Sequence, residues 1–351
     1  MIKNTNGWPL EHWLIELCTK CSLKCPRCMR QEQGFPTTNR DLTLDWFKNN
    51  FTGLLMSDLR KITFSGVRGD PIYAKHLIEV MRWVRTQNNK VGFVIITNGS
   101  YKTKQWWSEL SEVLNEKDNI HFSIDGWDQA SNETYRVNCD WKSMMIGVDT
   151  LKDTKAYKTW AAIVFKYNQH KIEHMKSLAK SLHFDEFQLT LSSKFNKVYP
   201  TYPEDDPLQP DDDYIASGLR HDRIHTRLTN KILYNPSWDI FFERFNKTST
   251  NDSIIPLCMI GNKGLYINAS GDFYPCCWTE NNYDMSLFGG KNIFNHLANT
   301  HKKHSLTEKM NDVTWKKVFV GMKKRSTDKM FGMCTKKCSN QNWNETHATL
   351  F

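Results

Sequence analysis

Residues 15–29 read IELCTKCSLKCPRCM and hold four of the ten cysteines of the chain, Cys18, Cys21, Cys25 and Cys28. A zinc site could use two C-x2-C pairs, but only three residues separate these pairs, whereas zinc modules usually need about a dozen or more. A bacterial ferredoxin run, C-x2-C-x2-C-x3-C, has a different order of spacings. Without Cys18 the spacing is C-x3-C-x2-C, and three thiolates on a four-iron cluster leave one iron open for catalysis. Zinc and other iron–sulfur uses remain alternatives.

The composition is that of a soluble globular protein. The 351 residues are 39% hydrophobic and 24% charged, with a mean hydropathy of −0.60, and this length suits one large domain with a small one. The sequence has no apolar run long enough to span a membrane, and its first residues, MIKNTNGWPLEHW, lack the apolar core of a secretory signal. We therefore expect a cytoplasmic protein without membrane contact, in which ten cysteines favour metal or redox chemistry over disulfides.

The net charge of +9 is concentrated in one segment. Residues 291–337 contain twelve Lys/Arg and three Asp/Glu. Such a run is either a solvated helical face or a surface for an anionic partner, such as nucleic acid, a phosphorylated metabolite or an acidic peptide. The opposite charge gathers among prolines at residues 200–213, which predicts a loop or linker.

Short strand-like runs alternate with longer helix-like stretches in the first half of the chain. Strands are predicted at residues 12–17, 61–65, 91–97, 120–124, 159–165 and 186–191, and helices at 44–56, 74–87, 104–114, 141–151 and 171–182. This order predicts βαβ units and a parallel sheet, either an incomplete barrel or a doubly wound sheet. Beyond a domain boundary near residue 250, residues 265–268 and 273–275 predict a β-hairpin.

The C-x3-C-x2-C triad, placed directly after the first predicted strand, resembles the signature of the radical S-adenosylmethionine (SAM) enzymes. Three further stretches resemble motifs of that family: SGVRGDP at residues 65–71, TNG at 97–99 and SIDG at 123–126. Each follows a different predicted strand, so in a parallel barrel all of them meet at one rim. The resemblance covers about residues 12–195. It implies an α/β fold with a partial (β/α)6 TIM-type barrel and a catalytic [4Fe-4S] cluster on Cys21, Cys25 and Cys28.

The resemblance also implies contacts to SAM. Backbone at Gly66, Gly69 and Asp70 would meet the methionyl ammonium group, and glycine suits this position because the chain must approach the ligand closely. This stretch is one residue longer than the common motif and has Asp where the family has Glu. Asn98 is a further expected contact, and Met29 stands where the family usually has an aromatic residue against adenine.

The fourth stretch supplies a carboxylate for the ribose. Asp125 can accept hydrogen bonds from both ribose hydroxyls, and Ser123, two residues earlier on a strand, would face the same way. Arg136 follows where the family often has an arginine. It would hold a carboxylate of SAM or of the substrate, or else form a surface salt bridge.

A second group of cysteines lies in the last hundred residues. Cys258 and Cys276 form a C-x12-G-x4-C pattern that resembles the opening of the SPASM or twitch extension of some radical SAM enzymes. With Cys334 and Cys338 they would bind one auxiliary [4Fe-4S] cluster, a zinc site being the alternative. Strand alternation through the hairpin would turn Cys277 away from the ligand Cys276. Cys139 stands alone and is expected to be structural.

The expected organisation has three parts: a radical SAM partial barrel at residues 1–195, an acidic proline-rich loop and aromatic helical connector at 196–250, and a twitch/SPASM-like auxiliary cluster domain at 251–351. The implied activity is reductive cleavage of SAM to a 5′-deoxyadenosyl radical, which abstracts hydrogen from a C–H bond. We expect oxidative modification of a peptide, protein or small polar metabolite, with electrons from a flavodoxin- or ferredoxin-type donor. RNA modification is a less favoured alternative, and a non-enzymatic iron–sulfur electron carrier is an alternative of another class.

Overall fold

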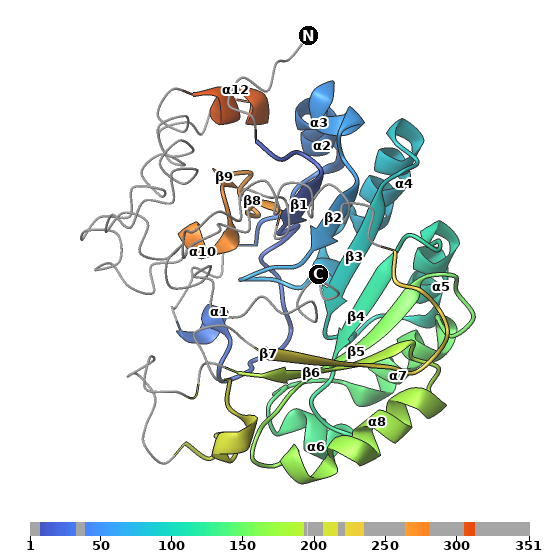
Figure 1. Ribbon diagram of the computed structural model, residues 1–351. Coiled ribbons are helices and arrows are strands. Elements are labelled where there is room, and N and C mark those ends of the chain that lie inside the picture. Colours follow the sequence, from blue (N-terminus) through green and yellow to red (C-terminus); the bar gives the residue numbers. More distant parts are fainter. Residues whose placement is uncertain are drawn as a thin grey trace, which may run out of the picture.

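A computed structural model describes residues 8–32, 39–192, 195, 206–216, 222–234, 264–280 and 305–312. These residues contain a nine-stranded sheet with the strand order β7-β6-β5-β4-β3-β2-β1-β8-β9 (Figure 1). The strands are β1 (His12–Ile15), β2 (Lys61–Phe64), β3 (Gly92–Thr97), β4 (Asn119–Ser123), β5 (Tyr157–Ile163), β6 (Glu186–Leu191), β7 (Asp222–Arg227), β8 (Leu265–Ile267) and β9 (Phe273–Tyr274).

The first six strands run parallel, each paired with the next in the sequence. Strand β7 adds antiparallel to β6, and β8 adds parallel to β1 on the opposite side. The sheet is open, since β7 and β9 end the strand order. The predicted α/β fold with a partial barrel is confirmed, and every predicted strand from residue 12 to 191 is present within two residues of its expected limits.

Helices connect the parallel strands, and several of them begin at side chains that cap them. The described helices are α1 (Met29–Glu32), α2 (Leu44–Asn50), α3 (Leu54–Ser57), α4 (Leu77–Gln87), α5 (Lys104–Val113), α6 (Gln129–Glu133), α7 (Trp141–Thr150), α8 (Ile172–Ser181), α10 (Cys277–Glu280) and α12 (Leu306–Asn311), with 3-10 turns η1 (Pro71–Tyr73), η2 (Gln169–Lys171) and η4 (Asp212–Tyr214). Thr43, Thr103 and Asp140 accept hydrogen bonds from the first turns of α2, α5 and α7. The single helix predicted at 44–56 is wrong, because Gly53, with φ +52°, separates α2 from α3. None of the described helices combines the length and apolar character that a membrane crossing needs.

One face of the sheet, here called the outer face, carries the hydrophobic core. Its apolar side chains on β2 to β6 are all buried, and helices α4, α5, α7 and α8 lie against it (Figure 1). Trp107 of α5 lies 5.7 Å from Phe122 of β4, between ring centroids. These apolar side chains are Ile62, Phe64, Phe93, Ile95, Ile120, Phe122, Trp160, Ala162, Phe187 and Leu189. The register also places Lys158 of β5 and the exposed Ile224 of β7 on this face. The alternation of strand side chains therefore directs the opposite set, here called the inner face, away from these helices.

The predicted hairpin is confirmed, with β9 antiparallel to β8. Its turn uses Gly271 at φ +77°, and the amide of Asn268 donates to the carbonyl of Asp272 over 3.1 Å. The hairpin pairs with β1 and so extends the sheet of the barrel. The expectation that strand alternation continues through Cys276 and Cys277 is wrong: β9 ends at Tyr274, before Pro275, which has no N–H to donate to a ladder, and α10 begins at Cys277. The boundary expected near residue 250 lies outside the described residues.

Candidate functional site

The loop that carries the cysteine triad lies between β1 and α1 and is fixed by backbone contacts. The amide of Lys24 donates to the carbonyl of Val137 over 2.9 Å. The side-chain amide of Asn138 donates to the carbonyl of Ser22, also over 2.9 Å. These bonds attach the loop to the segment that follows α6, so the triad has a defined place next to the carboxyl end of β4.

The three cysteines of the triad pack on one cluster of buried side chains. Cys25 is buried against Tyr135 and Phe165, and Cys21 and Cys28 pack on the same cluster. Burial raises the pKa of Cys21 to about 12 and that of Cys25 to about 11, and for both the neighbouring thiols raise it further. Thiols in such surroundings stay protonated unless a metal centre takes them as thiolates.

Three cysteine thiols are a donor set that suits an iron–sulfur cluster. Among the residues that the structure describes, no three His, Cys, Asp or Glu side chains are gathered as they would be around one metal ion.

Cys18 stands apart from the triad. Its thiol is 1% exposed and lies 3.3 Å from the carbonyl oxygen of Asp70, to which it donates. Burial raises its pKa to about 12. This placement agrees with the notion of a buried thiol at this position, as Cys18 was expected to be when it is left out of the triad.

The loop after β2 lies directly against the cysteine loop. The amide of Asp70 donates to the carbonyl of Lys20 over 2.8 Å. A Cβ atom on Gly69 would collide with the carbonyl of Cys18, and one on Gly66 would lie 2.9 Å from Oε1 of Glu16. Gly69 is therefore required by the close approach of two backbone segments, and Gly66 by the packing of its own loop against Glu16.

The carboxylate of Asp70 is turned inward and is already engaged by protein groups. It accepts from the amide of Asn98 over 2.7 Å, from the Asn98 side chain over 2.5 Å and from the amide of Ile72 over 3.2 Å. Burial raises the pKa of Asp70 to about 6. Asn98 Nδ2 also lies 3.7 Å from the sulfur of Cys21. Asp70 thus orients Asn98 toward the triad, a role that its sequence position did not indicate.

Asp125 and Arg136 form a buried ion pair at the rim of the sheet. The guanidinium Nε of Arg136 donates to Oδ2 of Asp125 over 2.5 Å, and the amide of Ile163 donates to Oδ1 over 2.6 Å. The positive charge of Arg136 also opposes the rise in the pKa of Cys25 caused by burial. Arg136 therefore lies between the carboxylate and the triad and is not a surface salt bridge. Contact of Asp125 with ribose stays a prediction.

For the remaining residues expected at the site, the structure gives a position but fewer contacts. Ser123 ends β4 on the inner face, so Asp125 lies beyond the strand and the two do not share strand alternation. Met29 begins α1 and is half-buried. Cys276 and Cys277 are both half-buried against the core, whereas Cys258, Cys334 and Cys338 lie outside the described residues.

A buried charge network, here the Glu16–Arg68–Glu280 network, joins these loops to α10. Arg68 Nη2 lies 2.5 Å from Oε1 of Glu280, and Arg68 Nη1 lies 3.3 Å from Oε2 of Glu16. The side chain of Asn268 donates to Glu280 over 2.6 Å. Sequence reasoning missed these residues. Arg68 stands in the stretch that is one residue longer than the family motif, and this extra length was the available signal.

Residues 11–144 match a protein family described as a 4Fe-4S single cluster domain. The match contains the triad. A comparison with curated proteins finds no match.

Solved structures resemble the whole chain. A structure of native anSMEcpe with bound AdoMet matches with a TM-score of 0.53 at 15% identity, over 93% of this chain and 89% of that one. Native anSMEcpe with AdoMet and the Kp18Cys peptide matches with a TM-score of 0.52 at 14% identity, over 93% of this chain and 88% of that one. Streptococcus suis SuiB bound to the precursor peptide SuiA matches with a TM-score of 0.51 at 14% identity, over 95% of this chain and 72% of that one.

The protein has the radical SAM fold. In this fold the motif residues were expected to meet at one rim, and the described residues bear this out. Cys21, Asp70 and Asn98 come together on one side of that rim, and Cys25, Asp125 and Arg136 on the other.

Proposed function

We propose that the protein is a radical SAM enzyme whose Cys21, Cys25 and Cys28 hold a [4Fe-4S] cluster with one open iron. When bound, this group supplies the electron that splits SAM into methionine and a 5′-deoxyadenosyl radical, which takes hydrogen from a substrate C–H bond. The observation that carries the proposal is the convergence of the triad with Asn98 and with the Asp125–Arg136 pair.

The chain's own residues orient the reactants and exclude water. The carboxylate of Asp125 has accepting capacity beyond its bonds to Arg136 and Ile163, which suits the ribose hydroxyls. Arg136 supplies a positive charge for a carboxylate of SAM or substrate. The rings of Tyr135 and Phe165, with centroids 4.2 Å apart, close the triad off on one side.

The substrate that we favour is a peptide. A protein and a small polar metabolite are the other two candidate substrates. Support comes from the two matched structures that contain peptides, SuiB with SuiA and anSMEcpe with Kp18Cys. The net reaction that we favour is an oxidation, with a flavodoxin- or ferredoxin-type protein as electron donor. Copurification of RNA would instead support the alternative suggested by the basic residues 291–337.

The test is SAM cleavage by anaerobically reconstituted, dithionite-reduced protein, with 5′-deoxyadenosine measured by chromatography. We expect cleavage by the wild type and none by the triple variant C21A/C25A/C28A. The single variants C18A and C139A serve as controls, because both remove a buried thiol outside the triad. Full cleavage by the triple variant would refute the assignment.

We further propose an auxiliary [4Fe-4S] cluster on Cys258, Cys276, Cys334 and Cys338, which would accept an electron from the substrate. Four cysteines suffice for one such cluster. Iron analysis should give about eight irons per chain in the wild type and in Cys277→Ser, and about four in Cys276→Ser. Loss of iron in Cys277→Ser alone would exchange the two assignments, and equimolar zinc in the wild type would replace the auxiliary cluster.

A further inference from the structure

The Glu16–Arg68–Glu280 network joins three segments that are distant in the sequence. Glu16 follows β1, and its Oε1 accepts a hydrogen bond from the backbone amide of Arg68 over 2.5 Å. Its Oε2 lies 3.4 Å from the amide nitrogen of Ala269 and 3.4 Å from the hydroxyl of Tyr266, both in the β8–β9 hairpin. One carboxylate therefore connects the end of β1 with residues 65–71, here called the β2 loop, and with the hairpin.

The side chain of Arg68 extends this connection to α10. Its Nη1 lies 3.3 Å from Oε2 of Glu16, and its Nη2 lies 2.5 Å from Oε1 of Glu280. The side chain of Arg68 is 16% exposed, and those of the two glutamates are 0% and 3% exposed, so solvent screens both ion pairs weakly. Glu280 is also held by the side chain of Asn268 over 2.6 Å. The guanidinium of Arg68 is therefore fixed from the side of α10.

The β2 loop reaches the cysteine triad within two residues of Arg68. The amide of Asp70 donates to the carbonyl of Lys20 in the cysteine loop over 2.8 Å. The carboxylate of Asp70 accepts from the side chain of Asn98, whose Nδ2 lies 3.7 Å from the sulfur of Cys21. The conformation of the β2 loop therefore decides where these groups lie relative to the triad.

α10 belongs to the region of the second cysteine group. It begins at Cys277, directly after Cys276, and ends at Glu280. Burial raises the pKa of Glu16 to about 7; the charge of Arg68 lowers it, and the charge of Glu280 raises it further. The two carboxylates therefore repel each other, and the guanidinium between them holds the β2 loop and α10 together.

We infer that Arg68 is a positioning residue for SAM: its ion pair with Glu280 fixes the β2 loop, so that α10 controls the affinity of the triad site for SAM. This inference rests on the proposed function, because it takes the β2 loop to contact the methionyl group of SAM. Arg68 acts through the loop and needs no contact with SAM itself. A segment next to the second cysteine group thereby completes the SAM site of the barrel.

The experiment measures SAM binding by calorimetry to anaerobically reconstituted protein without dithionite, so that SAM is not cleaved. We expect about tenfold weaker binding in Arg68→Met and in Glu280→Gln. The double variant Arg68→Met/Glu280→Gln should bind as Arg68→Met does, because Glu280 acts through Arg68. Arg68→Lys keeps the charge and should recover part of the affinity.

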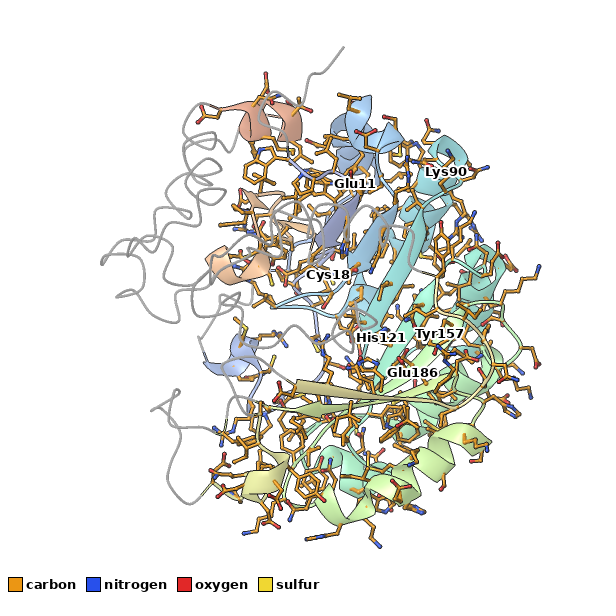
Figure 2. All side chains as sticks on the ribbon, viewed as in Figure 1. Glu11, Cys18, Lys90, His121, Tyr157 and Glu186 are labelled. Atoms are coloured by element: carbon orange, nitrogen blue, oxygen red, sulfur yellow. The ribbon has the colours of Figure 1, made fainter. Side chains whose placement is uncertain are left out.

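Arg85 provides a matched control at the other end of the sheet. Its Nη2 lies 2.6 Å and 2.7 Å from the two carboxylate oxygens of Asp118, and these side chains are 18% and 0% exposed, much as in the Arg68 pairs. Asp118 precedes β4 at the amino end of the sheet, where Figure 2 shows Lys90, whereas Cys18 lies at the opposite end. Arg85→Met should lower the Tm, as Arg68→Met does, because each breaks a buried ion pair. It should leave the affinity for SAM unchanged.

The outcomes separate a positioning role from a structural one. Unchanged SAM affinity in Arg68→Met at wild-type iron content would overturn the inference, and so would equal weakening by Arg85→Met. Additive losses in the double variant would also overturn it, since Glu280 would then act by another path. Glu280→Gln keeps the shape of the side chain and decides the matter if Arg68→Met does not fold. Absence of SAM binding in the wild type would refute the proposed function, whereas binding that no variant alters refutes this inference alone.

Discussion

The two faces of the sheet differ in the polarity of their side chains. On the outer face, side chains such as Ile95 and Trp160 are apolar and completely buried against helices. On the inner face the same strands present polar side chains, the buried Lys61 and Glu186 and the half-buried His121. The period-2 alternation of the strands therefore places apolar side chains that stabilise the fold on one face and polar side chains suited to chemistry on the other. The predictions below for Asp125 and for the isoleucines of β3 test this division, and the last one tests the buried carboxyl of Glu16.

The largest effect is expected at the rim of the inner face, for the Asp125–Arg136 pair. Asp125→Asn leaves the Arg136 charge without its carboxylate, and breaking a buried ion pair from one side costs about 3–5 kcal/mol. The double variant Asp125→Asn/Arg136→Met should recover part of this loss. Urea denaturation measures the free energy of unfolding; equal stability of single and double variants would contradict the pairing.

Asp125→Ala should also weaken SAM binding about tenfold to a hundredfold, because it removes an acceptor for the ribose hydroxyls. Calorimetry measures the affinity, and an unchanged affinity would remove Asp125 from the SAM site.

The next prediction compares neighbouring isoleucines of β3 on opposite faces. Ile95 is fully buried on the outer face and Ile96 is half-buried on the inner face. Ile95→Ala should cost about 2–5 kcal/mol because it leaves a cavity, and Ile96→Ala clearly less. The free energies of unfolding in urea decide the matter. Similar costs would mean that both faces are packed alike.

The smallest effect concerns Glu16, whose pKa burial raises from 4.5 to about 7. Between these values the folded state holds a proton that the unfolded state has released, so stability decreases as pH rises from about 4.5 to about 7. Glu16→Gln should flatten this decrease. Thermal unfolding of both proteins between pH 5 and pH 7 measures it, and identical slopes would exclude Glu16 as the cause.

Much of the fold could be predicted from the sequence, because alternating runs such as KITF at residues 61–64 and EFQLTL at 186–191 mark strands directly. The triad was predicted from its spacing together with its resemblance to the radical SAM signature. The same runs carry the polar residues of the inner face at every second position, a signal that was present but read only as strand periodicity. The Glu16–Arg68–Glu280 network could not be predicted, since its members meet only through tertiary contacts. The end of a strand was also harder to predict: strand alternation was expected to continue through Cys276 and Cys277, whereas β9 ends at Tyr274, before Pro275.

The pairing of β1 with β8 has a consequence for how the chain matures. Trp13 pairs with Leu265, so β1, which is synthesised early, can pair with β8 only after residue 265 has been synthesised. Domains form from the N-terminus as the chain emerges from the ribosome, and such distant pairing is slow. Until residues 265–280 emerge, β1 is an exposed edge strand and Arg68 lacks Glu280. The nascent chain therefore carries its cysteine loop beside an unfinished sheet until β8 has been synthesised.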